Sequence, residues 1–203
     1  AYNYQTEIRS QYLKELVSFT DNQFEKTHLM SSGTEATEAA LKILLINAKK
    51  NKKGKCILSI SGNYHGRTVG AQMMGYGGIY SESYNELAKY FPKIKFPYPW
   101  ELEGDDGEKF FFKELDKLSH SIDLQNDICG VMLETFQGWG ALFYPKSFIS
   151  SLDEFCKKNM IPLVFDEMQA GFYRTGKKFG FMHYDIKPDL ICVGKGIGSG
   201  FPL

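Results

Sequence analysis

Two short apolar runs near the end of the sequence, each followed closely by a charged residue, constrain the fold most. Ile161–Phe165 leads into Asp166, and Leu190–Val193 leads through Gly194 into Lys195. Continuous apolar runs of this length, followed by glycine-rich sequence, are typical of strands buried on both faces, and such strands belong to parallel sheets. In an open parallel sheet the ligand crevice lies beyond the carboxyl ends of the strands, so we expect Asp166 and Lys195 to point into it.

Three earlier runs repeat this arrangement and end shortly before other motifs. Right-handed crossovers between parallel strands place all five carboxyl ends along one edge of the sheet, so the five motifs should form one site. The sequence therefore predicts an α/β fold with a mostly parallel sheet. The three runs and their motifs are Thr27–Ser31 before Gly33 and Thr34, Cys56–Ile60 before Tyr64, and Cys129–Leu133 before Glu134.

Between these runs, apolar residues recur at helical spacing, and one helix start is marked by its own motif. Ser32 with Glu35 three residues later has the spacing of a capping box, and the first-turn amides of such a helix form an anion site. A capping box alone more often begins a helix that binds nothing, but this one follows a predicted strand. Other helices are expected at about residues 6–19, 110–118 and 146–159.

Taken together, the motifs describe one ligand. A helix N-terminus suits a phosphate, an aromatic side chain can lie over a flat ring, and a carboxylate with a lysine suits an electrophilic heterocycle. Each residue alone is also consistent with an ordinary structural role, Tyr64 as a loop aromatic and a histidine such as His65 as the partner in a structural hydrogen bond. Pyridoxal phosphate meets every requirement of the set, so we expect it as the cofactor.

The end of the sequence carries a series of motifs in a fixed order: Asp166-Glu167-Met168-Gln169, Gly171-Phe172-Tyr173-Arg174-Thr175-Gly176, Pro188-Asp189, Lys195-Gly196 and Phe201-Pro202-Leu203. In residue type, order and spacing they closely resemble the class III family of pyridoxal-phosphate-dependent aminotransferases. The resemblance covers nearly the whole chain. It implies the three-layer α-β-α fold of the large, cofactor-binding domain over residues 1–203, incomplete at both ends and without the small carboxyl-terminal domain.

The charges indicate a mechanism, and the resemblance adds further roles. Lys195 would hold the cofactor aldehyde as a Schiff base and then act as general acid and base, while Asp166 would pair with the pyridine nitrogen. By resemblance, Met168 would pack on the ring face opposite Tyr64, and Gln169 would bond the ring hydroxyl. The other members of the expected cofactor site are Gly33 and Thr34 at the phosphate, together with His65 and Glu134.

An enzyme of this family would move an amino group from an amine or amino acid, omega-amino groups included, to a 2-oxo acid. The resemblance also implies a homodimer. Aminomutases, decarboxylases and epimerases share the fold and cofactor, and these residues do not separate them. Another alternative is a non-catalytic nucleotide-binding α/β domain with Gly194–Gly200 as its phosphate loop. It fits less well, because Asp189 and Gly196 stand where a P-loop needs Gly and Ser or Thr.

Charge and cysteine usage exclude other classes of protein. The 24 Lys and Arg residues cancel the 24 Asp and Glu residues, so no basic field favours nucleic acid or an anionic membrane surface. No apolar stretch approaches the roughly 20 residues of a membrane span. The four cysteines form no C-x-x-C pair and no metal-ligand spacing with the histidines. They are expected to be buried reduced thiols, which predicts a cytoplasmic protein.

One motif departs from the family pattern. After Glu134 the family usually has Pro-x-Gln-Gly-Glu-Gly-Gly, whereas Thr135, Trp139 and Ala141 replace the Pro, the Glu and the last Gly here. A tryptophan in place of a charged side chain is expected to make this edge of the crevice more apolar, which leaves the substrate open.

Overall fold

The computed structural model describes residues 4–76, 81–102, 104 and 106–201. Pro202 and Leu203 of the expected Phe-Pro-Leu motif lie outside these residues. The chain divides into two compact units, Ala1–Met30 and Ser31–Leu203. The first unit contributes the helix α1 (Glu7–Phe19), which confirms the helix expected at residues 6–19.

The strand expected at Thr27–Ser31 is not formed, and this prediction was wrong. The segment has only two large apolar side chains, Leu29 and Met30, and both are only partly buried. An inner strand of a parallel sheet needs apolar cover on both faces, which so few apolar residues do not provide. The helix that begins at Gly33 therefore follows an irregular segment.

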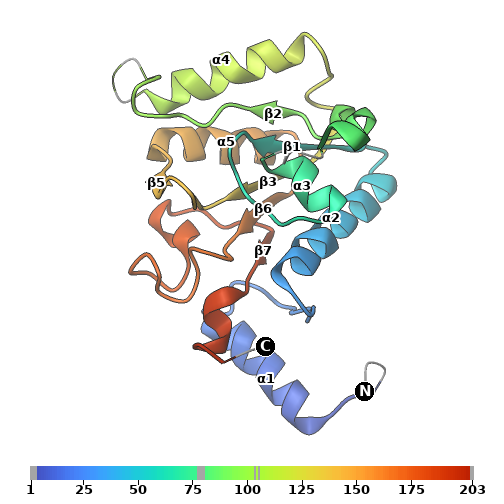
Figure 1. Ribbon diagram of the computed structural model, residues 1–203, viewed down its shortest axis with the longest axis vertical. Helices are drawn as coiled ribbons and strands as arrows, with labels where there is room; N and C mark the ends of the chain where they lie inside the picture. Colours follow the sequence, from blue (N-terminus) through green and yellow to red (C-terminus); the bar gives the residue numbers. More distant parts are fainter. Residues whose placement is uncertain (1–3, 77–80, 103, 105, 202–203) are drawn as a thin grey trace. The chain divides into compact units, whose positions relative to one another are not determined.

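The second unit is built on a five-stranded sheet in the order β2-β1-β3-β6-β7, with every pairing parallel (Figure 1). Every residue of β1, β3 and β6 is buried, because helices cover both faces. A short antiparallel pair, β4 with β5, follows β3. The expected mostly parallel α/β fold is confirmed. The strands are β1 (Cys56–Ile60), β2 (Lys93–Ile94), β3 (Ile128–Glu134), β4 (Phe136–Gln137), β5 (Leu142–Phe143), β6 (Leu163–Asp166) and β7 (Leu190–Cys192).

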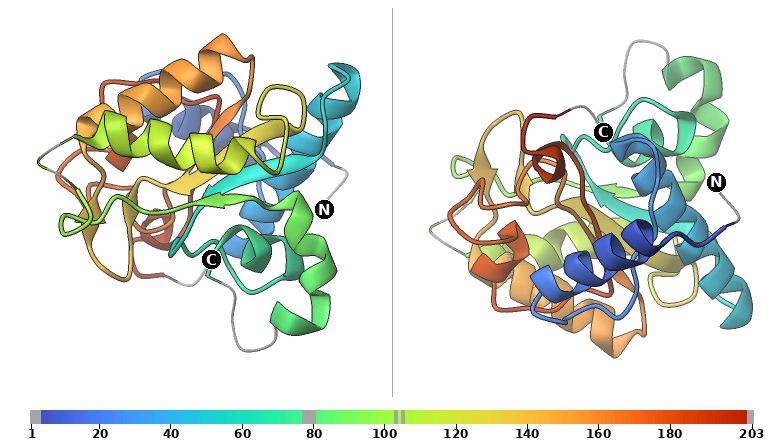
Figure 2. Two further views of the ribbon diagram at one scale, coloured as in Figure 1. Left: turned by 90° about the horizontal axis from the view of Figure 1, so that it is seen from above. Right: turned by 90° about the horizontal axis from the view of Figure 1, so that it is seen from below.

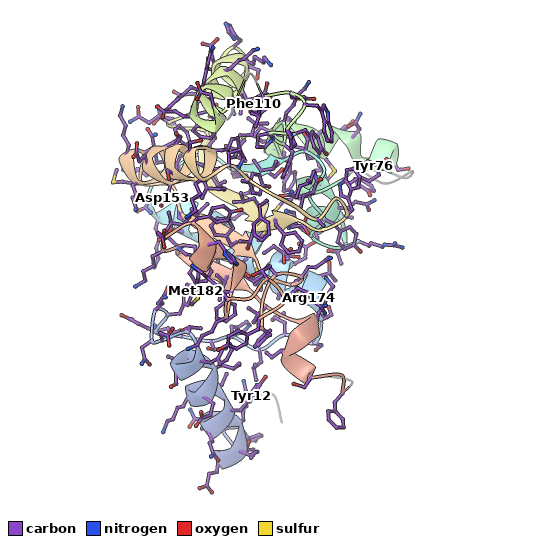
Figure 3. All side chains as sticks on the ribbon, turned by 90° about the vertical axis from the view of Figure 1, so that its left-hand side faces the viewer. Tyr12, Tyr76, Phe110, Asp153, Arg174 and Met182 are labelled. Carbon is purple, nitrogen blue, oxygen red and sulfur yellow. The ribbon has the colours of Figure 1, made fainter. Side chains whose placement is uncertain are left out.

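Helices lie on both sides of this sheet. Figure 2 shows α4 and α5 together on one face and α2 and α3 on the opposite face, which gives the three-layer arrangement. Phe110 marks α4 and Asp153 marks α5 among the side chains drawn in Figure 3. None of the described helices is long and apolar enough to cross a membrane. The helices are α2 (Gly33–Lys50), α3 (Val69–Met74), α4 (Gly107–Ser119) and α5 (Lys146–Lys158), with 3₁₀ helices η1 (Ser81–Tyr90), η2 (Gly180–His183) and η3 (Lys195–Gly198).

Leu44 anchors α2 to the sheet. Its side chain is fully buried in a cluster that joins α2 to the strands, and it lies so close to β3 that a Cβ at Gly130 would be 2.5 Å from Leu44 Cδ1. Glycine at position 130 therefore allows the helix to approach the strand. The other buried members of the cluster are Ala40, Leu41, Ala48, Ile57, Met74, Cys129, Met132, Val164 and Cys192.

We predict that Leu44→Ala lowers the apparent free energy of unfolding by about 3 kcal/mol, because the truncation leaves a cavity between α2 and the sheet. Urea unfolding of the full natural protein measures the change. Ile46→Ala on the same helix is the matched control, since the Ile46 side chain is half exposed, and its effect should be much smaller. Equal losses for the two variants would contradict this account of the core.

Candidate functional site

The register of the parallel strands aligns the carboxyl ends that carry the predicted site. Glu134 at the end of β3 pairs with Asp166 at the end of β6, and Asp166 pairs with Cys192 at the end of β7. Lys195 follows three residues after Cys192, and Tyr64 follows four residues after the end of β1. These chain segments therefore leave the sheet along one edge (Figure 1).

Asp166 is a buried carboxylate with hydrogen bonds to both oxygens. Its Oδ2 lies 2.8 Å from Nδ1 of His65, and its Oδ1 accepts a hydrogen bond from the backbone amide of Met168 at 3.0 Å. Both the Asp166 and the His65 side chains are almost completely buried. Two donors stabilise the negative charge of a carboxylate in such a place, so Asp166 is suited to face a cationic group.

His65 uses one ring nitrogen and leaves the other without a partner. Because the carboxylate of Asp166 accepts, His65 donates from Nδ1. Its Nε2 is buried and has no hydrogen-bond partner among the described residues. The histidine predicted as a site residue thus contacts Asp166 directly through one nitrogen, and its other nitrogen is buried.

Glu134 is buried beside this pair. Its Oε2 accepts a hydrogen bond from the backbone amide of Tyr64 at 3.0 Å, and its own amide donates to Oδ1 of Asn63 at 2.8 Å. Burial raises the pKa of Glu134 to about 7, although the nearby His65 and the Tyr64 amide oppose the rise. The negative charge of Asp166 contributes to the rise. Glu134 therefore titrates near neutral pH.

Met168 brings the start of α2 next to the turn that carries Lys195. A Cβ at Gly33 would lie 2.8 Å from Sδ of Met168, and a Cβ at Gly194 would lie 2.5 Å from the same atom. That Cβ at Gly194 would also lie 3.9 Å from Cα of Gly33. Both glycines permit this close packing, so the helix start and the residue before Lys195 meet at the Met168 side chain.

Lys195 has an unusual backbone conformation. Its φ is +39°, in the left-handed region that residues other than glycine rarely adopt. The side chain is exposed and makes no hydrogen bond or ion pair with the described residues. Residues held in such conformations are often found at functional sites, where the surrounding structure offsets the strain.

The first turn of α2 retains unused donors. The expected capping box is confirmed in part, since Oγ of Ser32 accepts from the amide of Glu35 at 3.3 Å. The carboxylate of Glu35 accepts from the Ser31 amide at 2.8 Å, one residue before the cap. The amides of Gly33 and Thr34 have no hydrogen-bond partner among the described residues, so they can bind an anion.

The remaining predicted residues lie around Glu134. Tyr64 is half exposed, and its backbone amide is held by Glu134. Gln169 is exposed, and its Nε2 lies 3.4 Å from the carbonyl oxygen of Gly138. A Cβ at Gly138 would be 2.7 Å from Oε1 of Gln169 and 2.8 Å from Oε1 of Glu134. Trp139, which replaces the usual Glu of the family pattern, is largely exposed and donates from Nε1 to the Gly62 carbonyl at 3.0 Å.

Glu167 supports the site and was not singled out by the sequence reasoning. It is fully buried, and its carboxylate accepts hydrogen bonds from the Thr135 hydroxyl and, at 2.8 Å each, from the amides of Gly180 and Phe181. Burial raises the pKa of Glu167 against the effect of these three donors. The sequence held two signals: Glu167 stands in the motif Asp166-Glu167-Met168-Gln169, and Thr135 offers a hydroxyl donor where the family pattern has a proline.

The site therefore offers two backbone amides at the start of α2 for an anionic group and the carboxylate of Asp166 for a cationic atom. Among the described residues no three His, Cys, Asp or Glu side chains gather as a metal site requires. Asn63 is a further contributor that the sequence did not reveal, since its Oδ1 accepts both from the Glu134 amide and from the Tyr144 hydroxyl, the latter at 3.2 Å.

Comparison with known proteins gives consistent results. Residues 3–203 match the family model of aminotransferase class-III. The LysW-aminoadipate semialdehyde/glutamate semialdehyde transaminase of Sulfurisphaera tokodaii is 34% identical over 202 residues, which are 99% of this chain and 46% of that protein. The chain spans about half the length of the curated relatives it matches.

Two solved structures are similar over nearly the whole chain. An aminotransferase of Bacillus anthracis is 27% identical with a TM-score of 0.86, covering 98% of this chain and 46% of that one. The taurine:2-oxoglutarate aminotransferase of Bifidobacterium kashiwanohense, solved in complex with PLP and glutamate, is 25% identical with a TM-score of 0.81, covering 98% of this chain and 45% of that one.

The raised pKa of Glu134 predicts a pH-dependent stability. Between the usual pKa of 4.5 and about 7 the folded protein binds more protons than the unfolded chain, so stability falls as the pH rises through this window. Glu134→Gln cannot ionise and should escape this loss. The free energy of unfolding of the variant, relative to that of the wild type, should rise by at most about 1.4 kcal/mol per pH unit. This difference should level off above pH 7.

Urea unfolding of the full natural protein at a series of pH values measures this difference. Glu154→Gln, at an exposed position on α5, controls for the loss of a carboxylate alone. A difference between wild type and Glu134→Gln that stays constant across the window would show that Glu134 is not titrating as described.

Proposed function

The chain belongs to the class-III aminotransferase family, and we propose that it forms the cofactor-binding large domain of a pyridoxal-phosphate-dependent transaminase. The observation that carries the proposal is the buried carboxylate of Asp166, hydrogen-bonded through both oxygens, one strand away from Lys195 in its left-handed turn. A buried anion and a strained lysine at the ends of neighbouring strands suit this cofactor better than a structural role.

The residues of the site fit pyridoxal phosphate. Asp166 would face the ring nitrogen, and the amides of Gly33 and Thr34 would hold the phosphate. Lys195 would carry the cofactor covalently on Nζ. When bound, the cofactor supplies an electron sink for a carbanion at the substrate carbon. The other expected contacts are Tyr64 and Met168 on the two ring faces, Gln169 at the ring hydroxyl, and His65 and Glu134 close to Asp166.

Three side chains would have separate roles in the reaction. The carboxylate of Asp166 would keep a proton on the ring nitrogen, because a nearby negative charge favours the cationic form. His65 would hold that carboxylate in place through Nδ1, 2.8 Å from Oδ2. Nζ of Lys195 would take a proton from the substrate carbon and deliver it to the cofactor carbon, acting first as general base and then as general acid.

The proposed reaction moves an amino group from an amine or amino acid to a 2-oxo acid. The similar proteins are named for different substrates, so the proposal covers the class of reaction and not one donor and acceptor. The proposed homodimer rests on the family resemblance. A cytoplasmic location is supported by the four cysteines, all of which are buried and free.

We predict that borohydride reduction of the natural protein with pyridoxal phosphate, followed by peptide mapping, places the label on Lys195. Lys195→Ala should lose the label. Lys177→Ala is the matched control, because Lys177 lies on the same stretch of chain and its Nζ donates to the Met182 carbonyl at 2.7 Å, and it should keep the label. Label on Lys177, Lys178 or Lys187 in the wild type would contradict the assignment.

We also predict that Asp166→Asn lowers kcat by roughly 100- to 1000-fold, the range expected when one positioned group that stabilises developing charge is lost. The substitution keeps the shape of the side chain, so the fold should change little. Asp189→Asn is the control at the opposite end of the same strands, where Asp189 Oδ2 accepts from the Leu163 amide at 2.8 Å. Equal turnover in wild type and Asp166→Asn would leave Asp166 with a structural role only.

A further inference from the structure

One polar face of α2 holds the segment 65–71 that follows Tyr64. The three side chains on this face, Thr34, Thr37 and Glu38, stand at the three- and four-residue spacing that brings helical neighbours together. The Thr37 hydroxyl lies 2.8 Å from the carbonyl of Thr34 and 2.8 Å from that of His65. The helix that begins at the proposed phosphate position is thus tied to the histidine that contacts Asp166.

Glu38 caps the next helix from outside. Thr68 is the N-cap residue of α3, yet its side chain makes no capping hydrogen bond. Oε1 of Glu38 accepts instead from the amide of Ala71 at 3.0 Å and from the hydroxyl of Thr68. A single carboxylate on α2 therefore replaces the cap that Thr68 would otherwise provide for α3.

This contact fixes the direction of a chain of hydroxyl groups. As a carboxylate, Glu38 can only accept, so the proton of Thr68 points toward Glu38. The oxygen of Thr68 lies 3.1 Å from that of Thr34, and with its proton already used it can only accept there. The hydroxyl of Thr34 must then donate to Thr68, which sets the orientation of the Thr34 side chain.

The surrounding backbone leaves little room for another arrangement. Gly66 has a φ of +133°, and a Cβ at this position would lie 2.0 Å from Oγ1 of Thr34. A Cβ at Gly70 would lie 2.6 Å from Oε2 of Glu38. Segment 65–71 is packed directly against the side chains that hold it. A shift of Glu38 would therefore change the position of the Thr34 side chain.

We propose that Glu38 is a positioning residue for the cofactor phosphate. Acting through Thr68, it holds Thr34 in place beside the unused amides of Gly33 and Thr34. By its charge alone a carboxylate near the phosphate would oppose anion binding. The hydrogen bonds that Glu38 accepts from Thr68 and Ala71 account for a carboxylate at this position. This inference rests on the proposed function, because it takes Gly33 and Thr34 as the phosphate site.

The test compares the affinity of the full natural protein, freed of cofactor, for pyridoxal phosphate and for pyridoxal, which lacks the phosphate. Absorbance titration gives both dissociation constants, and their ratio reports the phosphate contribution alone. Glu38→Ala should reduce the preference for pyridoxal phosphate about tenfold, the order expected for lost hydrogen bonding to a charged group. A general loss of structure would weaken both ligands and leave the ratio unchanged.

Two conservative variants separate reach from charge. Glu38→Asp keeps the charge but withdraws the carboxylate by one methylene, and it should lose the preference as Glu38→Ala does. Glu38→Gln loses the charge but keeps an acceptor oxygen for Thr68 and Ala71, and it should retain the preference. Glu154→Ala is the control for loss of a carboxylate, since Glu154 is exposed on α5, outside both α2 and segment 65–71, and it should keep the preference.

The outcomes distinguish this inference from the proposed function. A wild type that binds neither aldehyde would overturn the proposed function and the inference with it. A wild type that prefers pyridoxal phosphate, with Glu38→Ala and Glu38→Asp keeping that preference, would overturn the inference alone. A preference that follows charge, lost in Glu38→Gln but kept in Glu38→Asp, would overturn it as well.

Discussion

Hydrogen bonding between the parallel strands β3, β6 and β7 sets the position of the groups in the site. The pairing of Glu134 with Asp166, and of Asp166 with Cys192, brings three strand ends level. A one-residue slip would turn each side chain to the opposite face of the sheet. The close packing of Met168 with Gly33 and Gly194 depends on the same alignment, so sheet register and site geometry are one constraint.

The same alignment concentrates acidic groups in the interior. Glu134, Asp166 and Glu167 are all buried, and burial raises the pKa of both glutamates, with a smaller contribution from the charge of Asp166. Each acid is stabilised differently: Asp166 by His65 and a backbone amide, and Glu167 by three donors. Glu134 accepts from the Tyr64 amide, and its burial raises its pKa to about 7. When Glu134 is protonated near neutral pH, it carries no negative charge that would repel the carboxylates of Asp166 and Glu167.

Much of this structure could be predicted from local sequence patterns, and the exceptions have physical reasons. The apolar runs ending at Ile60, Leu133 and Phe165 are strands because their burial on both faces is visible in their composition. The run Leu190–Val193 also contains a strand, but β7 lies at the edge of the sheet and is only partly buried, so the burial expected for it was wrong. The strand predicted at Thr27–Ser31 was wrong, because two apolar residues do not suffice for an inner strand.

The contacts that link distant segments left no sequence signal. The cap of α3 depends on Glu38, which lies 33 residues before Ala71, and the acceptor for the Glu134 amide is Asn63, 71 residues earlier. Such pairs become apparent only once the chain has folded, since neither spacing nor composition distinguishes these side chains from ordinary polar residues. The roles of the nine predicted site residues stay predictions, although the structure brings their segments together.

Thr135 shows how one departure from a family pattern becomes tied to the rest of a fold. Its hydroxyl supplies one of three hydrogen bonds to the buried Glu167, and its carbonyl accepts from the Tyr184 hydroxyl at 2.8 Å. A proline at this position would remove the hydroxyl and leave Glu167 with two donors. Substitutions at 135 and 167 are therefore not independent, and their effects should not add.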